Sequence, residues 1–242
     1  MCRRLLVYGL DIASNVDRVS TNPTERIKEV AREMKPHLRG WLHLVTFPLS
    51  VAAGIVLIVL SPDERARIAT AVFAVSSSML FGSSALFHRG SWSPRWHGVL
   101  RRLDHSSIFL LIAGTYTPFA VMLLDDRNAR ILLSLVWGGA LLGIAFRISW
   151  VGAPRWLYLP VYIALGWAAI FWLRGFASAG PAILTLIVTG GALYSIGGVV
   201  YGLKRPNPIP RWFGFHEVFH SFTIAAFAVH YVGVSMVVYG AR

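Results

Sequence analysis

The chain has 242 residues, of which 55% are hydrophobic and 14% are charged, and its formal net charge is +12. An ordinary soluble domain carries about 25% charged residues, so this composition excludes a typical soluble protein. The charged residues form short clusters between long apolar runs, which indicates a polytopic membrane protein. The single cysteine, Cys2, excludes an intramolecular disulfide.

Residues 1–40 are predicted to form a cytoplasmic N-terminal leader, and residues 41–242 a transmembrane domain. Thr24 is placed to cap a helix whose apolar face includes Ile27 and Met34. This pattern predicts a short amphipathic helix on the inner membrane surface, and the alternative is a solvated helix with no further role. The leader contains no apolar core of the kind found in cleavable signal peptides, so we expect no cleavable signal peptide.

Seven apolar stretches follow the leader. Each approaches or exceeds the ~20 residues that cross a ~30 Å hydrocarbon core. Backbone groups find no water inside a bilayer, so helices are the expected conformation. The sequence therefore predicts an all-α, seven-helix transmembrane bundle, with spans near residues 41–60, 68–87, 106–124, 129–150, 156–173, 182–203 and 213–239.

The distribution of basic residues predicts the orientation of these spans. If the N-terminus is cytoplasmic, 17 of the 23 Lys and Arg residues lie on the cytoplasmic side and 6 lie outside. This asymmetry follows the positive-inside rule. We therefore expect a multi-pass protein of the cell (inner) membrane with its N-terminus inside and its C-terminus outside. Topology accounts for the basic charge, so no nucleic-acid partner is expected.

Two pairs of glycines lie within the fourth and sixth stretches at small-xxx-small spacing. The pairs are Gly139 with Gly143 and Gly198 with Gly202. This spacing favours close helix packing, either within the chain or between chains, so a homo-oligomer stays open as an alternative.

The last stretch opens with the pattern H-E-x-x-H, formed by His216, Glu217 and His220. On a helix, residues four apart share one face, so both imidazoles can reach one metal ion. In soluble metalloproteases with this pattern the glutamate is the general base. The alternative is a pair of interfacial histidines that bind lipid headgroups or loop carbonyls.

Alternating helix direction brings two further polar groups to the same depth. The second stretch runs inward and ends at His88, while the third runs outward and begins near Asp104. His88, His216 and His220 would then meet at one membrane edge. Three histidines with water as a fourth ligand form an open catalytic zinc geometry, so we predict a Zn²⁺ site.

Asp104 and Ser84 are the candidate catalytic residues beside this metal. A charged side chain in a membrane helix is costly and indicates a function, and Asp104 is suited to hydrogen-bond a zinc-bound water. The alternatives are a helix cap or an ion pair with Arg101 or Arg102. Ser84 shares a helix face with His88 and is suited to bind substrate or water, the alternative being a bond to its own helix backbone.

The remaining histidines are weaker candidates. His105 points about 100° away from Asp104 on a helix, and second-shell or interfacial roles are open for His43. His230 lies ten residues beyond His220, about 15 Å along a helix, which is too far to share an ion. It is the one histidine well placed for the alternative of a bis-histidine haem. Residues 115–117 are candidates for the wall of a cavity above the site, with simple packing as the alternative.

These motifs together resemble the hemolysin III proteins, the bacterial relatives of the progestin and adipoQ receptors (PAQR). The resemblance rests on Ser84-x3-His88, on the run from Asp104 to Pro118, and on His216-x3-His220, and it spans roughly residues 35–239. It implies seven helices with a cytoplasmic N-terminus and a zinc held by the three histidines. It also implies that Asp104, rather than Glu217, positions the zinc-bound water. The wider superfamily includes alkaline ceramidases and is proposed to contain membrane hydrolases.

Three functions are consistent with these observations. The first is zinc-dependent hydrolysis of an amide or ester in a membrane lipid, with an acyl chain held in an apolar cavity. The second is a sensor of membrane state in which zinc is structural. The third is a cytolytic pore, which would require an oligomer because seven helices with few buried charges do not resemble an aqueous channel.

Overall fold

The computed structural model describes residues 36–240. The amphipathic helix predicted between Thr24 and Met34 lies outside the described residues. Seven helical segments in the described part are long and apolar enough to cross a membrane, which confirms the predicted all-α architecture. They are α3 (Trp41–Val59), α4 (Glu64–Arg89), α5 (Pro94–Leu123), α6 (Asp126–Ser149), the segment Arg155–Ala177, α9 (Pro181–Leu203) and α10 (Phe215–Gly240).

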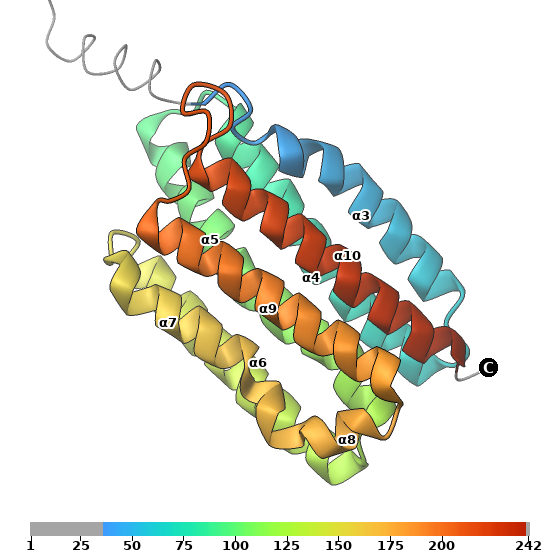
Figure 1. The fold of residues 1–242 in the computed structure, drawn as a ribbon. Helices are drawn as coiled ribbons and strands as arrows, with labels where there is room; N and C mark the ends of the chain where they lie inside the picture. The colour runs from blue at the N-terminus through green and yellow to red at the C-terminus, as the bar shows by residue number, and fades with distance from the viewer. Residues whose placement is uncertain (1–35, 241–242) are drawn as a thin grey trace, which may run out of the picture.

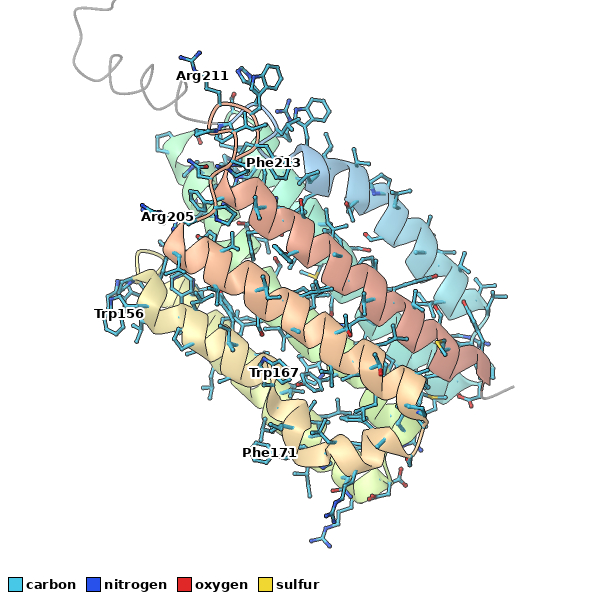
Figure 2. All side chains as sticks on the ribbon, in the orientation of Figure 1. Trp156, Trp167, Phe171, Arg205, Arg211 and Phe213 are labelled. Carbon is cyan, nitrogen blue, oxygen red and sulfur yellow. The ribbon has the colours of Figure 1, made fainter. Side chains whose placement is uncertain are left out.

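Helices that are neighbours in sequence pack side by side, and α10 lies against both α9 and α3 (Figure 1). The helix α5 is the most deeply buried span and contacts α4, α6, α7 and α10. Large apolar side chains cover much of the outside, and Leu142 and Phe171 are 75% and 79% exposed. Phe171 and Trp156 project away from the bundle (Figure 2). An apolar outer surface of this kind is suited to lipid and not to water.

Small residues allow the helices to approach one another closely inside the bundle. A Cβ added at Gly143 would lie 2.2 Å from Cζ of Phe109 on α5, and one added at Gly202 would lie 2.7 Å from Cδ2 of Leu159. Apolar side chains gain little by leaving lipid, so such close packing is a main source of helix association in membranes. These members of the two predicted glycine motifs therefore pack against side chains of the same chain.

The helix α5 begins ten residues earlier than Asp104, whereas the apolar stretches predicted a third span that begins only near residue 106. Pro94 occupies the first turn, where its fixed φ and missing N–H are tolerated. The added turns carry basic residues and therefore fall outside the apolar stretch that the sequence shows. Asp104 consequently lies in the third turn of α5, and Ser93 holds the N-cap position, so Asp104 is not a helix cap.

The fifth spanning segment is broken inside the bundle, although its sequence predicted one continuous helix. It consists of α7 (Arg155–Gly166), the 3-10 turn η2 (Ala168–Trp172) and the short helix α8 (Leu173–Ala177). The Tyr116 hydroxyl of α5 donates to the Gly166 carbonyl at 2.6 Å and accepts from the Ala169 N–H at 2.9 Å. Irregular backbone is tolerated at membrane depth where protein groups satisfy it, and Tyr116 does so here.

The segment before α3 is tied to the segment before α10. The N–H groups of His37 and Leu38 donate to the carbonyls of Arg211 and Trp212 at 2.9 and 3.2 Å. This pairing places Arg39 beside the first turn of α10. The beginnings of the first and last spans are therefore fixed to each other at the end of the bundle where α4 also ends.

Candidate metal centre

Three histidines converge at this end of the bundle, from the last turn of α4 and the first turns of α10. The Nε2 atoms of His88 and His216 are 3.2 Å apart, and one ligand atom from each of His88, His216 and His220 lies within 4.8 Å of the others. In tetrahedral zinc sites with bonds of 2.0–2.1 Å, ligand nitrogens are about 3.3 Å apart. The predicted convergence is confirmed, and the cluster has the donors and spacing to hold a metal ion.

Burial supports the fit of a metal to this cluster. His88 and His220 are buried and His216 is half-buried, and Nδ1 of His220 has no hydrogen-bond partner among the described residues. Neutral imidazoles are the commonest ligands of transition metals. Three of them in a buried pocket form a set that a metal satisfies better than further hydrogen bonds do.

Asp104 stands next to the cluster, on α5. Its Oδ2 atom is 3.9 Å from Nε2 of His88, which is too long for a direct hydrogen bond. The Ser84 side chain of α4 lies near the Asp104 carboxyl group, and both residues line the same cavity. The predicted alternative of an ion pair with Arg101 or Arg102 is not seen among the described residues, and Arg102 donates to the carbonyls of Ile148 and Gly98. The structure thus brings both candidate catalytic residues to the histidines.

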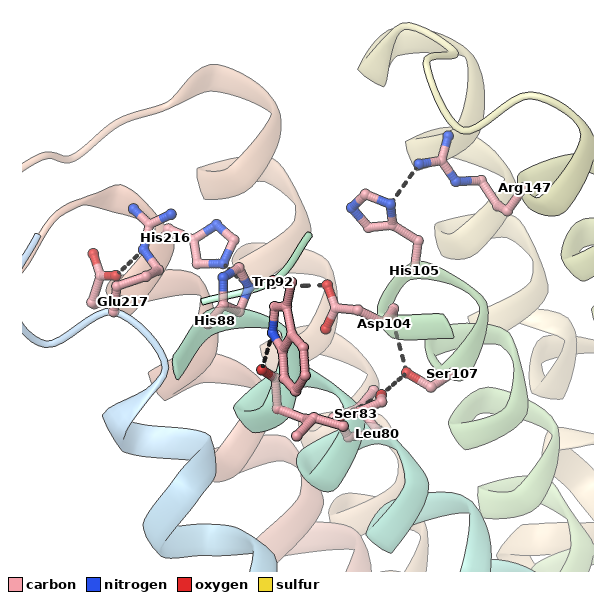
Figure 3. Close-up of polar contacts among 12 residues, drawn as sticks. Leu80, Ser83, His88, Trp92, Asp104, His105, Ser107, Arg147, His216 and Glu217 are labelled. Carbon is pink, nitrogen blue, oxygen red and sulfur yellow. Dashed lines mark hydrogen bonds and ion pairs between the residues drawn. The ribbon is translucent and has the colours of Figure 1, made fainter. Parts of the chain in front are cut away.

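Glu217 faces away from the three histidines (Figure 3). Its side chain is fully buried, one carboxylate oxygen pairs with Nε of Arg39, and the other accepts from the Gly214 N–H at 2.9 Å. Both oxygens are therefore engaged in holding the start of α10. Although the sequence reads H-E-x-x-H, the geometry gives Glu217 a structural contact and leaves Asp104 as the carboxylate beside the cluster.

His43 of α3 packs directly on a member of the cluster. Its ring is stacked on that of His220, with centroids 3.7 Å apart and planes 9° from parallel. Phe81 contacts the His43 ring edge-on, with ring centroids 5.1 Å apart. The stack restricts the plane of the His220 ring, which is a positioning contact that helical spacing alone does not reveal.

Comparison with known proteins agrees with this arrangement. The model of the family described as "Haemolysin-III related" matches residues 31–231. The chain belongs to the haemolysin-III family. It is 34% identical over 190 residues to "Hemolysin-3 homolog" of Bacillus subtilis (strain 168), covering 77% of this chain and 86% of that protein. It is 30% identical over 211 residues to "Hemolysin-3" of Bacillus cereus, covering 85% and 93%.

A more distant likeness extends to an animal protein. The haemolysin-III chain is 27% identical over 195 residues to "Adiponectin receptor protein" of Drosophila melanogaster, which covers 72% of this chain and 43% of that protein. The resemblance to hemolysin III proteins and their receptor relatives, inferred from the motifs, is therefore confirmed.

A buried arginine lies on α6 of this haemolysin-III protein, outside the histidine cluster. Arg147 of α6 is 1% exposed, and its Nη2 atom is 2.8 Å from Nδ1 of His105. Its guanidinium also lies 4.2 Å from the ring centre of Tyr158. As predicted, His105 is turned away from the cluster (Figure 3). Sequence reasoning missed Arg147 as an interior residue, although an arginine within an apolar stretch is itself a signal.

A cavity of about 320 Å³ extends from the cluster into the bundle. Ser84, Asp104, His216 and His220 line one end, and the walls come mainly from apolar side chains of α5, α7, α9 and α10. Of the mid-helix residues predicted as wall candidates, Thr115 and Tyr116 line it. Thr117 instead donates to the Ala113 carbonyl and accepts from the Trp137 indole. The cavity therefore joins a polar site to an apolar interior.

Proposed function

We propose that this haemolysin-III protein is a zinc-dependent hydrolase that cleaves an amide or ester bond of a membrane lipid. The observation that supports the proposal most is the continuity of the cavity. Its polar end carries Ser84, Asp104, His216 and His220, and its walls are mainly apolar. A lipid with its acyl chain among these walls would present its polar linkage to the cluster.

The metal we propose is zinc, held by His88, His216 and His220. Three protein ligands of this kind are typical of catalytic zinc sites, whereas Mg²⁺ and Ca²⁺ prefer oxygen ligands. When bound, zinc would polarise a lipid carbonyl and lower the pKa of water to about 7. His43, stacked on His220, would hold one imidazole in the plane that binding requires.

The remaining chemistry falls to Asp104 and Ser84. The Asp104 carboxylate would accept a proton from the attacking water and direct the water oxygen toward the lipid carbonyl. It would return that proton to the departing alcohol or amine as the ester or amide bond breaks. Ser84 lies near Asp104 and would hold the carboxylate in that orientation by donating a hydrogen bond to it. The apolar walls of the cavity would keep bulk water away from the reacting groups.

The proposed location is the cell (inner) membrane, with the N-terminus in the cytoplasm. The excess of Lys and Arg on one side of the spans supports this orientation. The cluster lies where α4 ends and α10 begins, so it would sit near the cytoplasmic surface.

Metal content and lipid turnover test the proposal together. Purified protein in lipid nanodiscs would be analysed for zinc by mass spectrometry and incubated with a long-chain N-acyl amide and a fatty acyl ester. We expect about one zinc per chain, with the metal absent from His220→Ala and retained by Asp104→Asn. Loss of a general base costs 10²–10⁴-fold in rate, so Asp104→Asn should reduce turnover by about that factor. Replacement of the exposed His97 by alanine is the matched control.

Two results would contradict the proposal. One is folded wild-type protein without stoichiometric metal after zinc has been supplied. The other is an Asp104→Asn variant that hydrolyses lipid at the wild-type rate.

A second candidate is a sensor in which the metal is structural. It is favoured by the origin of the ligands, because an ion bound to His88, His216 and His220 would tie the end of α4 to the start of α10. This function predicts that His88→Ala or His220→Ala lowers the melting temperature while no lipid is consumed by the wild type. Steady lipid turnover would exclude it.

A cytolytic pore is suggested by the names of the bacterial relatives. The cavity within one chain is lined mainly by apolar side chains, so a pore would require several copies of the chain. Release of dye from loaded liposomes is the direct test, and intact liposomes at high protein density would exclude this function.

A further inference from the structure

The deep end of the cavity contains three polar atoms without hydrogen-bond partners among the described residues. They are Oγ1 of Thr115, the hydroxyl of Tyr194 and Nδ1 of His230. All three residues line the cavity, and Thr115 and His230 are each 7% exposed. Unsatisfied polar groups are costly at membrane depth and are normally paired. Three of them, contributed to one cavity by α5, α9 and α10, indicate a place for a polar group of a ligand.

The contacts of His230 define which kind of group fits. Its Nε2 atom is 3.2 Å from the Ile187 carbonyl oxygen. A carbonyl only accepts, so Nε2 carries the proton, and a neutral imidazole then leaves Nδ1 as an acceptor. A Cβ added at Gly190 would lie 2.2 Å from this Nε2 atom, so glycine at 190 is what lets the ring reach Ile187. The ligand must therefore bring a hydrogen-bond donor to Nδ1.

The two hydroxyls extend this requirement. The centres of the Tyr194 and Phe119 rings lie 5.7 Å and 6.1 Å from the centre of the His230 ring. Thr115 is one helical turn from Phe119 and shares its face of α5. Hydroxyls of Tyr and Thr both donate and accept. The group that complements all three residues both donates and accepts, and it is uncharged because the surrounding walls are apolar.

We propose that Thr115, Tyr194 and His230 form a subsite that binds a hydroxyl group on an otherwise apolar lipid chain. A ligand hydroxyl donates to Nδ1 of His230 and accepts from Tyr194 or Thr115. A ketone or ester carbonyl brings no proton for Nδ1, and a plain methylene satisfies none of the three atoms. The subsite would therefore bind hydroxylated acyl chains more tightly than unsubstituted ones, which the apolar walls alone would not distinguish.

The position of the subsite defines where the hydroxyl must be. His230 follows His220 by ten residues, which is about 15 Å along α10. A lipid whose head group lies at the histidine cluster would reach His230 with the middle of its acyl chain. The ligand class is therefore a mid-chain hydroxylated fatty acyl group. Placement of the head group rests on the proposed function, but binding itself does not require turnover.

Competition binding to the full-length protein in nanodiscs tests the subsite. Octadecanoate, 2-hydroxyoctadecanoate and 12-hydroxyoctadecanoate would each displace a fluorescent fatty acid. One to two additional hydrogen bonds should make the 12-hydroxy acid bind roughly tenfold more tightly than octadecanoate. The 2-hydroxy acid carries its hydroxyl beside the head group, so its affinity should not depend on the deep subsite.

Variants assign the preference to residues. Tyr194→Phe, Thr115→Val and His230→Leu should each reduce the preference for the 12-hydroxy acid several-fold while octadecanoate affinity changes little. Thr223→Val is a matched control in the same cavity, because that hydroxyl already donates to the Phe219 carbonyl. Tyr231→Phe is the matched control for Tyr194, since its hydroxyl donates to the Ala53 carbonyl. Both controls should keep the wild-type preference.

The outcomes separate the subsite from the hydrolase. Equal binding of octadecanoate and the 12-hydroxy acid by the wild type would overturn the subsite, and so would a preference that none of the three variants reduces. Asp104→Asn should keep the preference, since that residue lies at the other end of the cavity. A preference without lipid hydrolysis would support the subsite and contradict the hydrolase, whereas hydrolysis without a preference would do the reverse.

Discussion

Replacement of Arg39 by methionine is predicted to be strongly destabilising. The Glu217 side chain is fully buried, and its partners are Arg39 and the Gly214 N–H. Methionine preserves much of the apolar stem but leaves the carboxylate without a counter-charge. Breaking a buried ion pair by removing one partner typically costs about 3–5 kcal/mol, and we expect a loss of free energy of unfolding in that range.

The reciprocal change should be milder. Arg39 is 18% exposed, so its charge is able to reach water when the carboxylate is removed. In Glu217→Gln the amide oxygen still accepts from the Gly214 N–H, and the loss is expected to be about 1.5–3 kcal/mol, as for one hydrogen bond to a charged group. The double variant Arg39→Met/Glu217→Gln removes the unpaired charge altogether. It should recover part of the stability lost in Arg39→Met alone.

Unfolding in detergent, followed by tryptophan fluorescence, measures these differences. For a chain of this size 1 kcal/mol corresponds to about 2–4 °C in melting temperature, so Arg39→Met should melt roughly 6–20 °C below the wild type. The reasoning fails if Arg39→Met is as stable as Glu217→Gln, or if the double variant is no better than Arg39→Met. It also fails if Glu217→Gln folds and binds zinc but loses lipid turnover 10²-fold or more, as loss of a general base would cause.

Three further changes test the packing, the broken segment and the metal. Gly143→Ala should cost about 1–3 kcal/mol because its Cβ would overlap Phe109. Gly138→Ala, with open space at its Cβ, should melt near the wild-type temperature. Tyr116→Phe frees two backbone groups at the break of the fifth segment and should lower the free energy of unfolding by about 1–3 kcal/mol in denaturant titrations. Chelation should lower the melting temperature of the zinc-loaded wild type and leave His220→Ala unchanged.

The location of the histidines was predictable because two regularities of the sequence determine it. Helical spacing places His216 and His220 on one face, and alternating span direction brings His88 to the same end of the bundle. Both regularities depend on chain geometry and not on which helices are neighbours. The histidine cluster could be predicted from the sequence for that reason, whereas the pairing of the neighbouring Glu217 with Arg39 could not.

Other features depend on contacts between distant parts of the chain. The pairing of Glu217 with Arg39 joins residues 178 positions apart, and H-E-x-x-H alone suggested a different role for the glutamate. The break after Gly166 is likewise stabilised by Tyr116 of another helix, so an apolar stretch of spanning length gave no sign of it. The early start of α5 was hidden because its first turns are basic and an apolar count ends before them.

The link between the start of α3 and the start of α10 has a consequence for biosynthesis. Arg39 emerges from the ribosome nearly 180 residues before Glu217. The first span is therefore made before the last span, to which its N-terminal end is bound in the finished protein. Two of the three histidines of the cluster, His216 and His220, are also made last. Assembly of the histidine cluster is therefore confined to the end of synthesis. A nascent chain stalled before the seventh span would present Arg39 without Glu217 and His88 without the other two histidines.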